Sequence, residues 1–415
     1  MKTKKYDIAI AGAGIGGLVA ALSLIKKGYT VLVLEQAKQL GEVGAGLQLS
    51  PNANRVLFNL GLGKALETVA SVPTGKAIRL WKSGKQWPLF DLGQDAVAHF
   101  GFPYYTVHRA DLHRLLVEKV RSLDPEAICL DSKVTSFEED SSQITIVLEN
   151  GRRVTADLLV GADGVHSSVR SQLTGPDDPT FSGLIAWRGV IPASKLPESL
   201  RQPVPTNWVG PGAHAIHYPL RRGELINFVG IVERSDWQVE SWNEIGTIEE
   251  CLNDFRGWNE NIATMINNLD RPYKWALMLR DPLANWTSQR VALVGDACHP
   301  TLPMLASGAA MAIEDGYVLA RCLDELDAPL EQKLHTYQSL RKQRTDRIVT
   351  GSAENAQRFH NPLLADDDYA ERYISEEWSE EKIIARYSWI FEYNVDGLDL
   401  TQGHRKQDSG HDPAL

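Results

Sequence analysis

The start of the chain consists of two short apolar runs joined by a longer apolar segment that opens with glycines. Tyr6–Ala11 and Thr30–Glu35 have the length and the apolar character of buried β-strands. Ile15–Lys27, which lies between them, is long enough to form a buried helix. This order predicts a βαβ unit, and therefore a parallel sheet with a right-handed crossover.

Two further helices are indicated by different signals. Ser50 followed by Pro51 is typical of a helix start, and the helix should run to about Leu60. Arg109–Leu123 is an amphipathic helix, because apolar residues recur at helical spacing. These apolar residues are Leu112, Leu115, Leu116 and Val120.

Strand patterns dominate the segments that follow the first helices. Short strands are predicted at Ala77–Trp81 and Gln86–Phe90, and a buried strand at Leu158–Val160. Glu149–Gly151 has the sequence of a hairpin turn. Residues 180–280 are rich in Trp, Pro and strand-like alternation, which predicts a mainly antiparallel β lobe with helices attached.

The apolar pattern of the first fold returns after this lobe. Arg290–Val294 is typical of a short buried strand, and Ala309–Leu323 of a buried helix. The first fold is therefore predicted to be interrupted by the β lobe and then resumed. The rest of the chain is largely helical and ends in a polar tail at about Thr401–Leu415, expected to be frayed.

The amino terminus could be mistaken for a signal peptide or a membrane helix. Three lysines at positions 2, 4 and 5 precede the uncharged segment Ile8–Ile25, which is 18 residues long. Asp7 stands before this segment, and four glycines between positions 12 and 17 would destabilise a continuous helix. A strand, a glycine turn and a buried helix explain these residues better, so no stable membrane insertion is expected.

Composition and charge narrow the class of protein. The 415 residues are 43% hydrophobic and 23% charged, which is ordinary for a globular chain. Acidic residues number 53 and basic residues 43, so the net charge of −10 argues against nucleic-acid binding. The four cysteines are at least 24 residues apart, which favours free thiols and a cytoplasmic location.

The glycine turn carries a dinucleotide-binding fingerprint. Gly12, Gly14 and Gly17 give the pattern G-x-G-x-x-G between a strand and a helix, and Glu35 follows 18 residues later. Gly12 permits the turn, Gly14 lets a pyrophosphate approach the backbone, and Gly17 lets the helix pack on the strand. The helix N-terminus offers N–H groups to the phosphates, and Glu35 can accept hydrogen bonds from a ribose.

Two later motifs complete a family pattern. Asp163-Gly164 follows the strand at Leu158–Val160, and Gly295-Asp296 follows the strand at Arg290–Val294. With the fingerprint, they make the chain resemble the single-component FAD-dependent aromatic hydroxylases. Within these, it is most similar to the branch of salicylate hydroxylase, 3-hydroxybenzoate 6-hydroxylase and 6-hydroxynicotinate 3-monooxygenase, over residues 1 to about 395.

The resemblance implies an α/β fold. A Rossmann-like FAD-binding domain is interrupted by a mainly antiparallel β substrate lobe and followed by a helical C-terminal part. The implied ranges are 1–179 for the first part of the FAD-binding domain, with a small β insertion near 75–105, 180–284 for the substrate lobe, 285–360 for the resumed domain with a long helix, and 361–415 for the helical segment and tail.

The resemblance also implies how FAD is held, without a covalent bond. Asp296 should hold the ribityl chain, and Arg109 should contact the flavin side of the cofactor. The start of a helix should face the flavin N1–C2=O edge and stabilise negative charge there. The residues of this helix start are Gly308, Ala309, Ala310 and Met311.

Asp163 and Arg170 have two interpretations. In the family, the Asp-Gly segment serves FAD and the nicotinamide cofactor together, which makes Asp163 an FAD-binding candidate and Arg170 a nicotinamide-cofactor candidate. The alternative for both is a local helix-end cap with an ion pair. No second G-x-G-x-x-G occurs in a βαβ frame, so NAD(P)H is expected to visit as a transient co-substrate. The eleven histidines show no metal-binding spacing, so no metal is expected.

The substrate side is predicted on one strand. In His214–Tyr218, the period of two places His214, Ile216 and Tyr218 on one face and His217 on the other. The resemblance implies that His214 and Tyr218 line the substrate pocket, where the imidazole can take or relay a phenol proton. The alternative is a half-buried histidine and a core tyrosine. Arg188 could face a substrate carboxylate or pair with an acid at the sheet edge.

One segment departs from the family patterns. Pro303 stands where relatives acting on 3-hydroxybenzoate often carry Gln, and Met304 stands where decarboxylating relatives commonly carry His. Neither reaction can therefore be assumed, and Met304 indicates a more apolar wall. Both residues are substrate-binding candidates.

The implied function is hydroxylation of a phenolic or heteroaromatic carboxylic acid by NAD(P)H and O2 through a flavin C4a-hydroperoxide. The alternative enzyme is an FAD-dependent monooxygenase or epoxidase for a more apolar natural product. A flavoprotein that binds FAD without catalysing a reaction is the third hypothesis. The expected partners are a small aromatic substrate and O2, and the chain is expected to be a monomer or homodimer.

Overall fold

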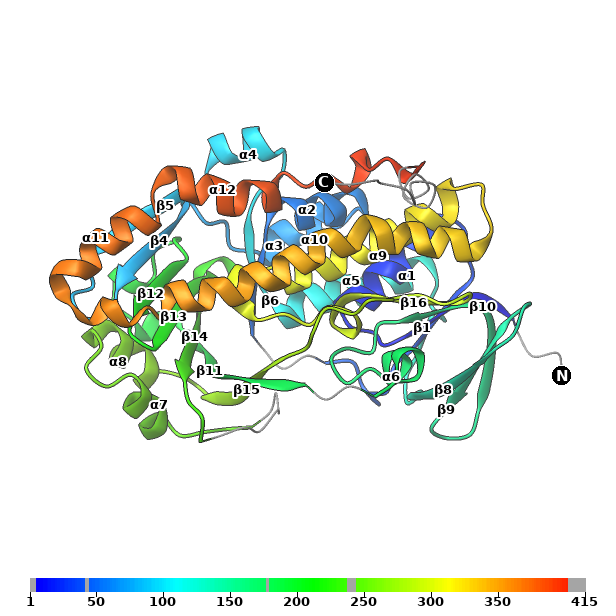
Figure 1. The fold of residues 1–415 in the computed structure, drawn as a ribbon, viewed down its shortest axis with the longest axis horizontal. Coiled ribbons are helices and arrows are strands. Elements are labelled where there is room, and N and C mark those ends of the chain that lie inside the picture. The colour runs from blue at the N-terminus through cyan, green and yellow to red at the C-terminus, as the bar shows by residue number, and fades with distance from the viewer. Residues whose placement is uncertain (1–4, 42–44, 177–178, 237–243, 402–415) are drawn as a thin grey trace, which may run out of the picture.

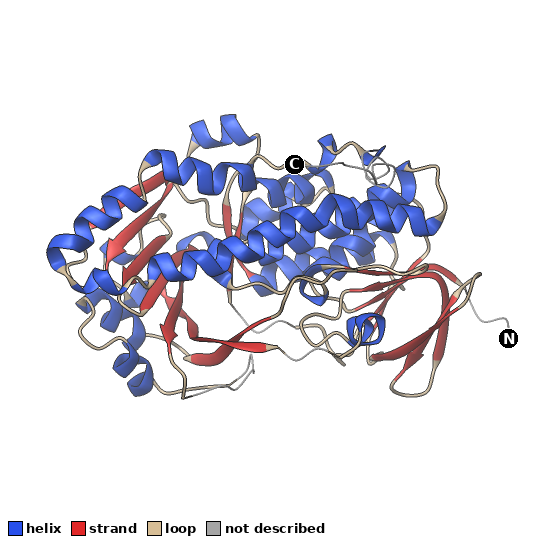
Figure 2. Cartoon of the chain, viewed as in Figure 1, coloured by secondary structure: helices blue, strands red, loops and turns tan. Residues whose placement is uncertain are grey.

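The computed structural model describes residues 5–41, 45–176, 179–236 and 244–401. Nearly all of the tail expected to fray lies outside these residues. Figure 1 shows one group of strands around β1 and β10 and a second around β11–β15, with the long helix α10 crossing between them. Figure 2, in the same view, shows most of the helices above and between these two groups of strands, with α7 and α8 below the second group.

The first sheet contains the predicted βαβ unit. Its strand order is β7-β2-β1-β10-β9-β8, with β16 also paired to β10. The pairs β1/β2, β1/β10, β2/β7 and β10/β16 are parallel, whereas β9 is antiparallel to β10 and β8. The strands are β1 (Tyr6–Ala11), β2 (Val31–Leu34), β7 (Ile128–Cys129), β8 (Val134–Glu139), β9 (Ile144–Leu148), β10 (Arg153–Gly161) and β16 (Val291–Leu293). The predicted return of the first fold after the β lobe is confirmed by β16.

The first helix, α1 (Ile15–Lys26), is apolar because other elements cover it on several sides. It packs against β1, α5 (Arg109–Leu123) and α9 (Gly308–Glu325). A Cβ on Gly316 would lie 2.6 Å from the backbone nitrogen of Ala20, so α1 and α9 touch through their backbones. The uncharged amino-terminal segment is therefore an interior strand and helix. Within the described residues, no helix combines the length and the apolar character needed to cross a membrane.

The second sheet is mainly antiparallel, as predicted. Its order is β15-β11-β14-β13-β12-β4-β5, and only the pair β12/β4 is parallel. The strands are β4 (Gly75–Leu80), β5 (Gln86–Asp91), β11 (Thr180–Pro192), β12 (Thr206–Gly210), β13 (Ala213–Leu220), β14 (Leu225–Glu233) and β15 (Tyr273–Leu279). The sheet thus recruits two strands from the segment expected as a small β insertion in the first domain.

The two faces of this second sheet contact different parts of the molecule. One face packs with α7 (Ile248–Asp254) and α8 (Glu260–Asn267) around the buried Trp187 and Trp208. The opposite face shares an apolar cluster with the start of α9 and with α10 (Leu330–Phe359). The opposite face of the second sheet therefore packs toward the first domain.

The remaining elements connect and cover the two sheets. The short strands β3 (Gly46–Leu49) and β6 (Tyr105–His108) pair with each other, antiparallel. The remaining α-helices are α2 (Pro51–Asn59), α3 (Gly63–Val69), α4 (Gln94–Phe100), α6 (Ser168–Thr174), α11 (Asp367–Glu377) and α12 (Glu380–Phe391). The 3-10 turns are Ala193–Lys195, Glu198–Leu200, Arg221–Gly223, Gly295–Ala297, Pro303–Leu305, Pro362–Ala365 and Val395–Gly397.

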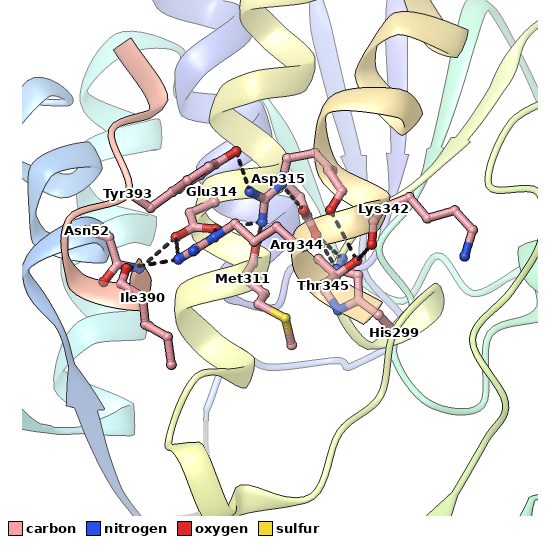
Figure 3. A network of polar contacts seen from close by, with 12 residues as sticks. Asn52, His299, Met311, Glu314, Asp315, Lys342, Arg344, Thr345, Ile390 and Tyr393 are labelled. Carbon is pink, nitrogen blue, oxygen red and sulfur yellow. Dashed lines mark hydrogen bonds and ion pairs between the residues drawn. The ribbon is translucent and has the colours of Figure 1, made fainter. Parts of the chain in front are cut away.

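A buried ion network joins α9 to α10 (Figure 3). Glu314 and Asp315 of α9 and Arg341 of α10 have fully buried side chains. Arg341 Nη2 lies 2.6 Å from Glu314 Oε2, and Arg341 Nε lies 2.8 Å from Asp315 Oδ1. Arg344 Nη2 contacts Glu314 Oε1 at 2.9 Å. Burial alone would raise the pKa of Glu314, but Arg344 and Arg341 hold it below its ordinary value.

The network should dominate the stability of the resumed domain. Arg341→Met leaves two buried carboxylates without a full set of partners, which should cost about 3–5 kcal/mol of unfolding free energy. The matched control is Lys342→Met, which removes a partly exposed pair with Asp346 within one helix and should cost about 0.5 kcal/mol or less. Urea unfolding of both variants measures the difference. Equal stabilities would show that the network does not hold the helices together.

Candidate active site

The glycine fingerprint forms a cradle with one open side. Gly12 has φ +100°, and a Cβ there would lie 2.4 Å from the carbonyl oxygen of Ala162. A Cβ on Gly17 would lie 2.1 Å from the carbonyl oxygen of Gly12. A Cβ on Gly14, by contrast, meets nothing within 4 Å. Gly12 and Gly17 therefore serve the packing of strand and helix, whereas Gly14 faces the space that a pyrophosphate would occupy.

Glu35 closes one side of this cradle. Its Oε2 accepts a hydrogen bond from the backbone N–H of Ala13 at 2.7 Å, and its Oε1 accepts one from Ala37 at 2.8 Å. Each carboxylate oxygen keeps a further lone pair, so the side chain can still accept ribose hydroxyls. His113 of α5 supports the same turn, because its Nε2 lies 2.8 Å from the carbonyl oxygen of Ala13.

The Asp163-Gly164 motif is hydrogen-bonded to the start of the helix that follows it. Asp163 Oδ2 accepts hydrogen bonds from the backbone N–H groups of Ser168 and Val169 at 2.9 and 3.2 Å, and Oδ1 accepts one from the Ser167 hydroxyl. These contacts cap the start of α6. They support the helix-cap alternative for Asp163, and its role toward FAD stays a prediction.

Arg170 lies inside the protein. Its side chain is 2% exposed, and its guanidinium donates to the carbonyl oxygens of Val165 and Ala297 at 2.8 and 3.3 Å. This burial gives no support to Arg170 as a contact for the nicotinamide cofactor. The residue instead ties the Asp-Gly motif to the Gly-Asp motif of the next strand.

Arg109 occupies the expected position at a helix start. It is the first residue of α5, and its backbone N–H donates to the carbonyl oxygen of Ala45 at 2.8 Å. The residue is thereby fixed beside the start of β3. Its contact with the flavin side of FAD stays a prediction.

Asp296 projects from a turn that the buried network holds in place. Gly295 has φ +63°, and its backbone N–H donates to Asp315 Oδ2 at 3.0 Å. The side chain of Asp296 is exposed, and its carboxylate makes no hydrogen bond or ion pair with any described residue. A fixed backbone with a free carboxylate is the arrangement needed to bind a polyol chain such as the ribityl of FAD.

The start of α9 is an uncapped helix N-terminus. Gly308 is its first residue, and the preceding Ser307 donates its hydroxyl to the carbonyl oxygen of Leu305 instead of capping the helix. Ala306 has φ +50°, so the chain turns sharply into the helix. The first N–H groups of this 18-residue helix, including those of Ala309 and Ala310, are available to an anionic ring edge.

The predicted substrate residues share one face of the second sheet. Register pairs His214 with Ile231 and Tyr218 with Asn227, and it places Arg188 beside Val229, which pairs with Ile216. Directly paired residues lie on the same face, so these side chains project together. His217 lies on the opposite face, where its Nδ1 accepts a hydrogen bond from Trp208. The predicted division of the strand into two faces is confirmed.

Burial sets the protonation of this face. Burial, with a smaller effect of His360, lowers the pKa of His214 well below 6.5, so His214 is a neutral base at pH 7. Burial raises the pKa of Tyr218, which Arg188 only partly opposes, so Tyr218 stays a phenol. Arg188 is 5% exposed and lies over the rings of Trp275 and Tyr273, at 4.7 and 5.7 Å from their centroids.

Of the candidates Pro303 and Met304, only Met304 links this face to the start of α9. Both belong to the turn Pro303–Leu305. Pro303 is exposed, whereas Met304 lies in one apolar cluster with Ile231 and with Met311 of the first turn of α9. The cluster connects the helix N-terminus expected at the flavin with the cross-strand neighbours of His214.

Several residues of this face are absent from the sequence prediction. Gly46 of β3 donates its N–H to Asn227 Oδ1 at 2.8 Å, and a Cβ there would lie 2.5 Å from the Tyr218 ring. Tyr104 donates its hydroxyl to Gln48 Oε1 at 2.8 Å beside them. The sequence gives little sign of their position, because these residues lie on segments remote from β13 and β14.

One cluster of metal-ligand types occurs in the described residues. The ligand atoms of Cys298, His299 and Asp315 lie within 4.8 Å of one another and are buried. Asp315 already accepts from Gly295, His299 and Arg341, and the Arg341 guanidinium would repel a cation there. We therefore assign the cluster a structural role, which is to hold the turn that carries Asp296.

The residues of the first domain fit FAD. Gly14 leaves space for a pyrophosphate, Asp296 has a free carboxylate, and Gly308 begins an uncapped helix. Family comparison agrees with this fit. Residues 5–352 match the model of the FAD binding domain family.

Relatives with similar sequences act on aromatic acids. The chain is 35% identical over 395 residues to a 3-amino-4-hydroxybenzoate 2-monooxygenase of Streptomyces platensis, covering 95% of this chain and 98% of that protein. It is 39% identical over 349 residues to 3-hydroxybenzoate 6-hydroxylase 1 of Aquipseudomonas alcaligenes, covering 83% and 87%. The structure of Klebsiella pneumoniae HpxO with FAD and uric acid has a TM-score of 0.81, 26% identity, and coverage of 94% and 97%.

Asp296→Ala should lose FAD and keep the fold. Its carboxylate makes no hydrogen bond or ion pair with any described residue, so the melting temperature of the apoprotein should change little. Asp327→Ala, which changes an exposed aspartate on the loop after α9, should retain the cofactor and is the matched control. The ratio of flavin to protein absorbance after gel filtration measures binding. Full FAD occupancy in Asp296→Ala would contradict its assignment to the cofactor.

Proposed function

Because the chain belongs to the FAD binding domain family and its relatives are FAD-dependent aromatic monooxygenases, we propose that it hydroxylates a phenolic or heteroaromatic carboxylic acid with NAD(P)H and O2. The protein is an FAD-dependent aromatic-ring monooxygenase. When bound, FAD supplies the redox chemistry that reduces O2 and transfers one oxygen atom.

One observation carries the substrate class. A neutral His214, a phenolic Tyr218 and a buried Arg188 lie on the same sheet face, and an apolar cluster joins that face to the start of α9. A cation held in an aromatic, water-poor setting favours a carboxylate ligand. A neutral imidazole favours a ligand that has a proton to give up. Together they fit a hydroxylated aromatic acid.

Each residue has a separate task. Arg188 binds and orients the carboxylate, and the Trp275 and Tyr273 rings hold its guanidinium in place. His214 removes the phenolic proton, since the resulting phenolate donates electrons into the ring and makes it more nucleophilic. Tyr218 donates a hydrogen bond to a substrate oxygen. The packing of Gly46 against Tyr218 and Asn227 fixes the position of this hydroxyl.

A second candidate function rests on the apolar residues of the same face. Ile216 and Val229 are paired next to His214 and Arg188, and Met304 belongs to the apolar cluster that this face shares with α9. A larger apolar natural product would use this lining, and the enzyme would then act as an epoxidase or another monooxygenase. The two candidate functions differ in whether the substrate must carry a carboxylate.

Aromatic acids should stimulate the oxidation of NADH or NADPH by the purified holoenzyme. A panel of hydroxybenzoates, aminohydroxybenzoates and hydroxypyridine carboxylates should include one compound that accelerates it about tenfold or more, with one hydroxylated product per NAD(P)H and little hydrogen peroxide. Oxygen uptake, peroxide and product are measured together. Esters of the active acid should be inactive, because Arg188 would lose its carboxylate partner. Stimulation by neutral apolar compounds alone would favour the second candidate.

Substitutions on the sheet face should separate binding from chemistry. His214→Gln should keep FAD and lower kcat by about 10²-fold, the lower end of the general-base range. Arg188→Gln should chiefly raise KM. His217→Gln, which changes the buried histidine on the opposite face, is the control and should keep kcat. Normal coupled turnover in His214→Gln would show that His214 is not the base.

A further inference from the structure

A chain of acid–base side chains leads away from His214 toward solvent. His214 Nδ1 lies 2.6 Å from Nε2 of His360, which follows the last residue of α10. His360 Nδ1 lies 3.1 Å from Glu233 Oε1, at the end of β14. The side chain of His360 is 2% exposed, whereas that of Glu233 is 57% exposed. The three groups therefore span the distance from the buried sheet face to water.

The carboxylate of Glu233 determines which ring nitrogen carries the proton in His360 and in His214. An ionised carboxylate only accepts, so His360 must carry its proton on Nδ1 to donate to Glu233. Its Nε2 is then an acceptor, which requires the proton of His214 to lie on Nδ1. The lone pair of His214 is consequently left on Nε2, which makes no hydrogen bond to any described residue. Glu233 thus orients a base toward the sheet face that carries Tyr218 and Arg188.

The outer end of this series of acid–base groups opens into a surface cavity of about 550 Å³. Its lining includes Glu233, Arg234, Gln357 and His360. Arg234, which follows Glu233 in the sequence just after β14, is paired with Asp236 and Asp254. The Glu233 carboxylate therefore faces a space that water can fill, without a competing ion pair to Arg234.

The backbone holds this chain in position. Gly212, in the turn between β12 and β13, donates its N–H to the carbonyl oxygen of His360 at 3.1 Å. The carbonyl oxygen of Gly212 accepts from the N–H of Glu233 at 2.9 Å. The end of α10 and the end of β14 are thus both bound to one turn, and the ring of Phe359 packs 4.9 Å from that of His214.

We propose that His214, His360 and Glu233 form a proton relay that carries the substrate's phenolic proton from the buried sheet face to solvent. This inference rests on the proposed function. The substrate O–H bond breaks as its proton passes to His214 Nε2. His214 passes its Nδ1 proton to His360 Nε2, His360 passes its Nδ1 proton to Glu233, and Glu233 releases it to water. The substrate remains as the phenolate, and the reverse sequence returns a proton to the product oxygen and restores both tautomers.

The relay needs no stable cation inside the protein. Burial lowers the pKa of both His214 and His360, although Glu233 opposes this for His360. The charged groups that face the pair are Glu233 at the end of β14 and Arg234 just after it, with Arg188 of β11 on the same sheet face. Concerted transfer along neutral rings avoids the cost of a buried imidazolium. A lone buried histidine would have to keep the proton.

The tautomers test the relay without any substrate. In holoenzyme labelled with ¹⁵N-histidine, long-range ¹H–¹⁵N correlation spectra should show His214 and His360 with the proton on Nδ1, assigned by loss of signals in His214→Gln and His360→Gln. Glu233→Leu should release the proton of His360 from Nδ1, because this variant removes the acceptor, whereas the amide oxygen of Glu233→Gln can still accept it. A proton on Nε2 of His214 in the wild type would overturn the relay.

Turnover tests it in the working enzyme. Glu233→Gln and His360→Gln should each lower kcat about tenfold, less than loss of the base itself, with little change in KM. The dependence of kcat on the fraction of D2O in the solvent should change from that of several transferred protons to that of one. The control variant Glu354→Gln changes an exposed carboxylate of α10 that is paired with Arg358. It should leave kcat and the solvent isotope effect unchanged. Added imidazole should restore kcat in His360→Ala, and it should leave unchanged the kcat of His217→Ala, which is expected to lose no activity.

The outcomes are distinguishable. Wild-type kcat and an unchanged isotope effect in Glu233→Gln and His360→Gln would overturn the relay and leave the hydroxylase assignment standing. A wild-type enzyme that no aromatic acid stimulates would overturn the proposed function, and the relay with it, whatever the tautomers.

Discussion

The buried contact of Arg341 with Glu314 and Asp315 is the interaction on which the rest of the molecule depends. Two adjacent carboxylates inside a helix are costly unless cations reach both, and Arg341 and Arg344 do so from the facing helix. The same Asp315 accepts from the backbone of Gly295. The ion network that joins two helices therefore also sets the turn that presents Asp296.

The 30-residue helix α10 connects this ion network to the second sheet. At 1.5 Å per residue it is about 45 Å long. Near its middle it supplies Arg341 and Arg344, and at its end His360 meets His214 of the second sheet. A single helix thus fixes the proposed cofactor region and the proposed substrate region relative to each other, as oxygen transfer between two bound molecules would require.

The residues proposed to bind the cofactor and those proposed to bind the substrate are positioned by different physical means. Around Gly12, Gly17 and Gly316, backbones approach so closely that a Cβ would collide, and the resulting shape leaves Gly14 open. On the second sheet, strand register decides position, because paired residues on β13 and β14 share a face. Apolar packing around Met304 and Met311 joins the two regions.

The sequence by itself determined the elements that depend on local pattern. Tyr6–Ala11 and Arg109–Leu123 have the predicted bounds, since strand and helix periodicities are properties of neighbouring residues. The glycine fingerprint and the two faces of β13 follow from the same local rules. Local pattern does not reveal which residues meet across the chain, because contacts between distant segments depend on the packing of whole elements. Only the tertiary structure decided that β4 joins β12, that Asp163 caps α6 and Arg170 is buried, and that His360, 146 residues from His214, lies beside it.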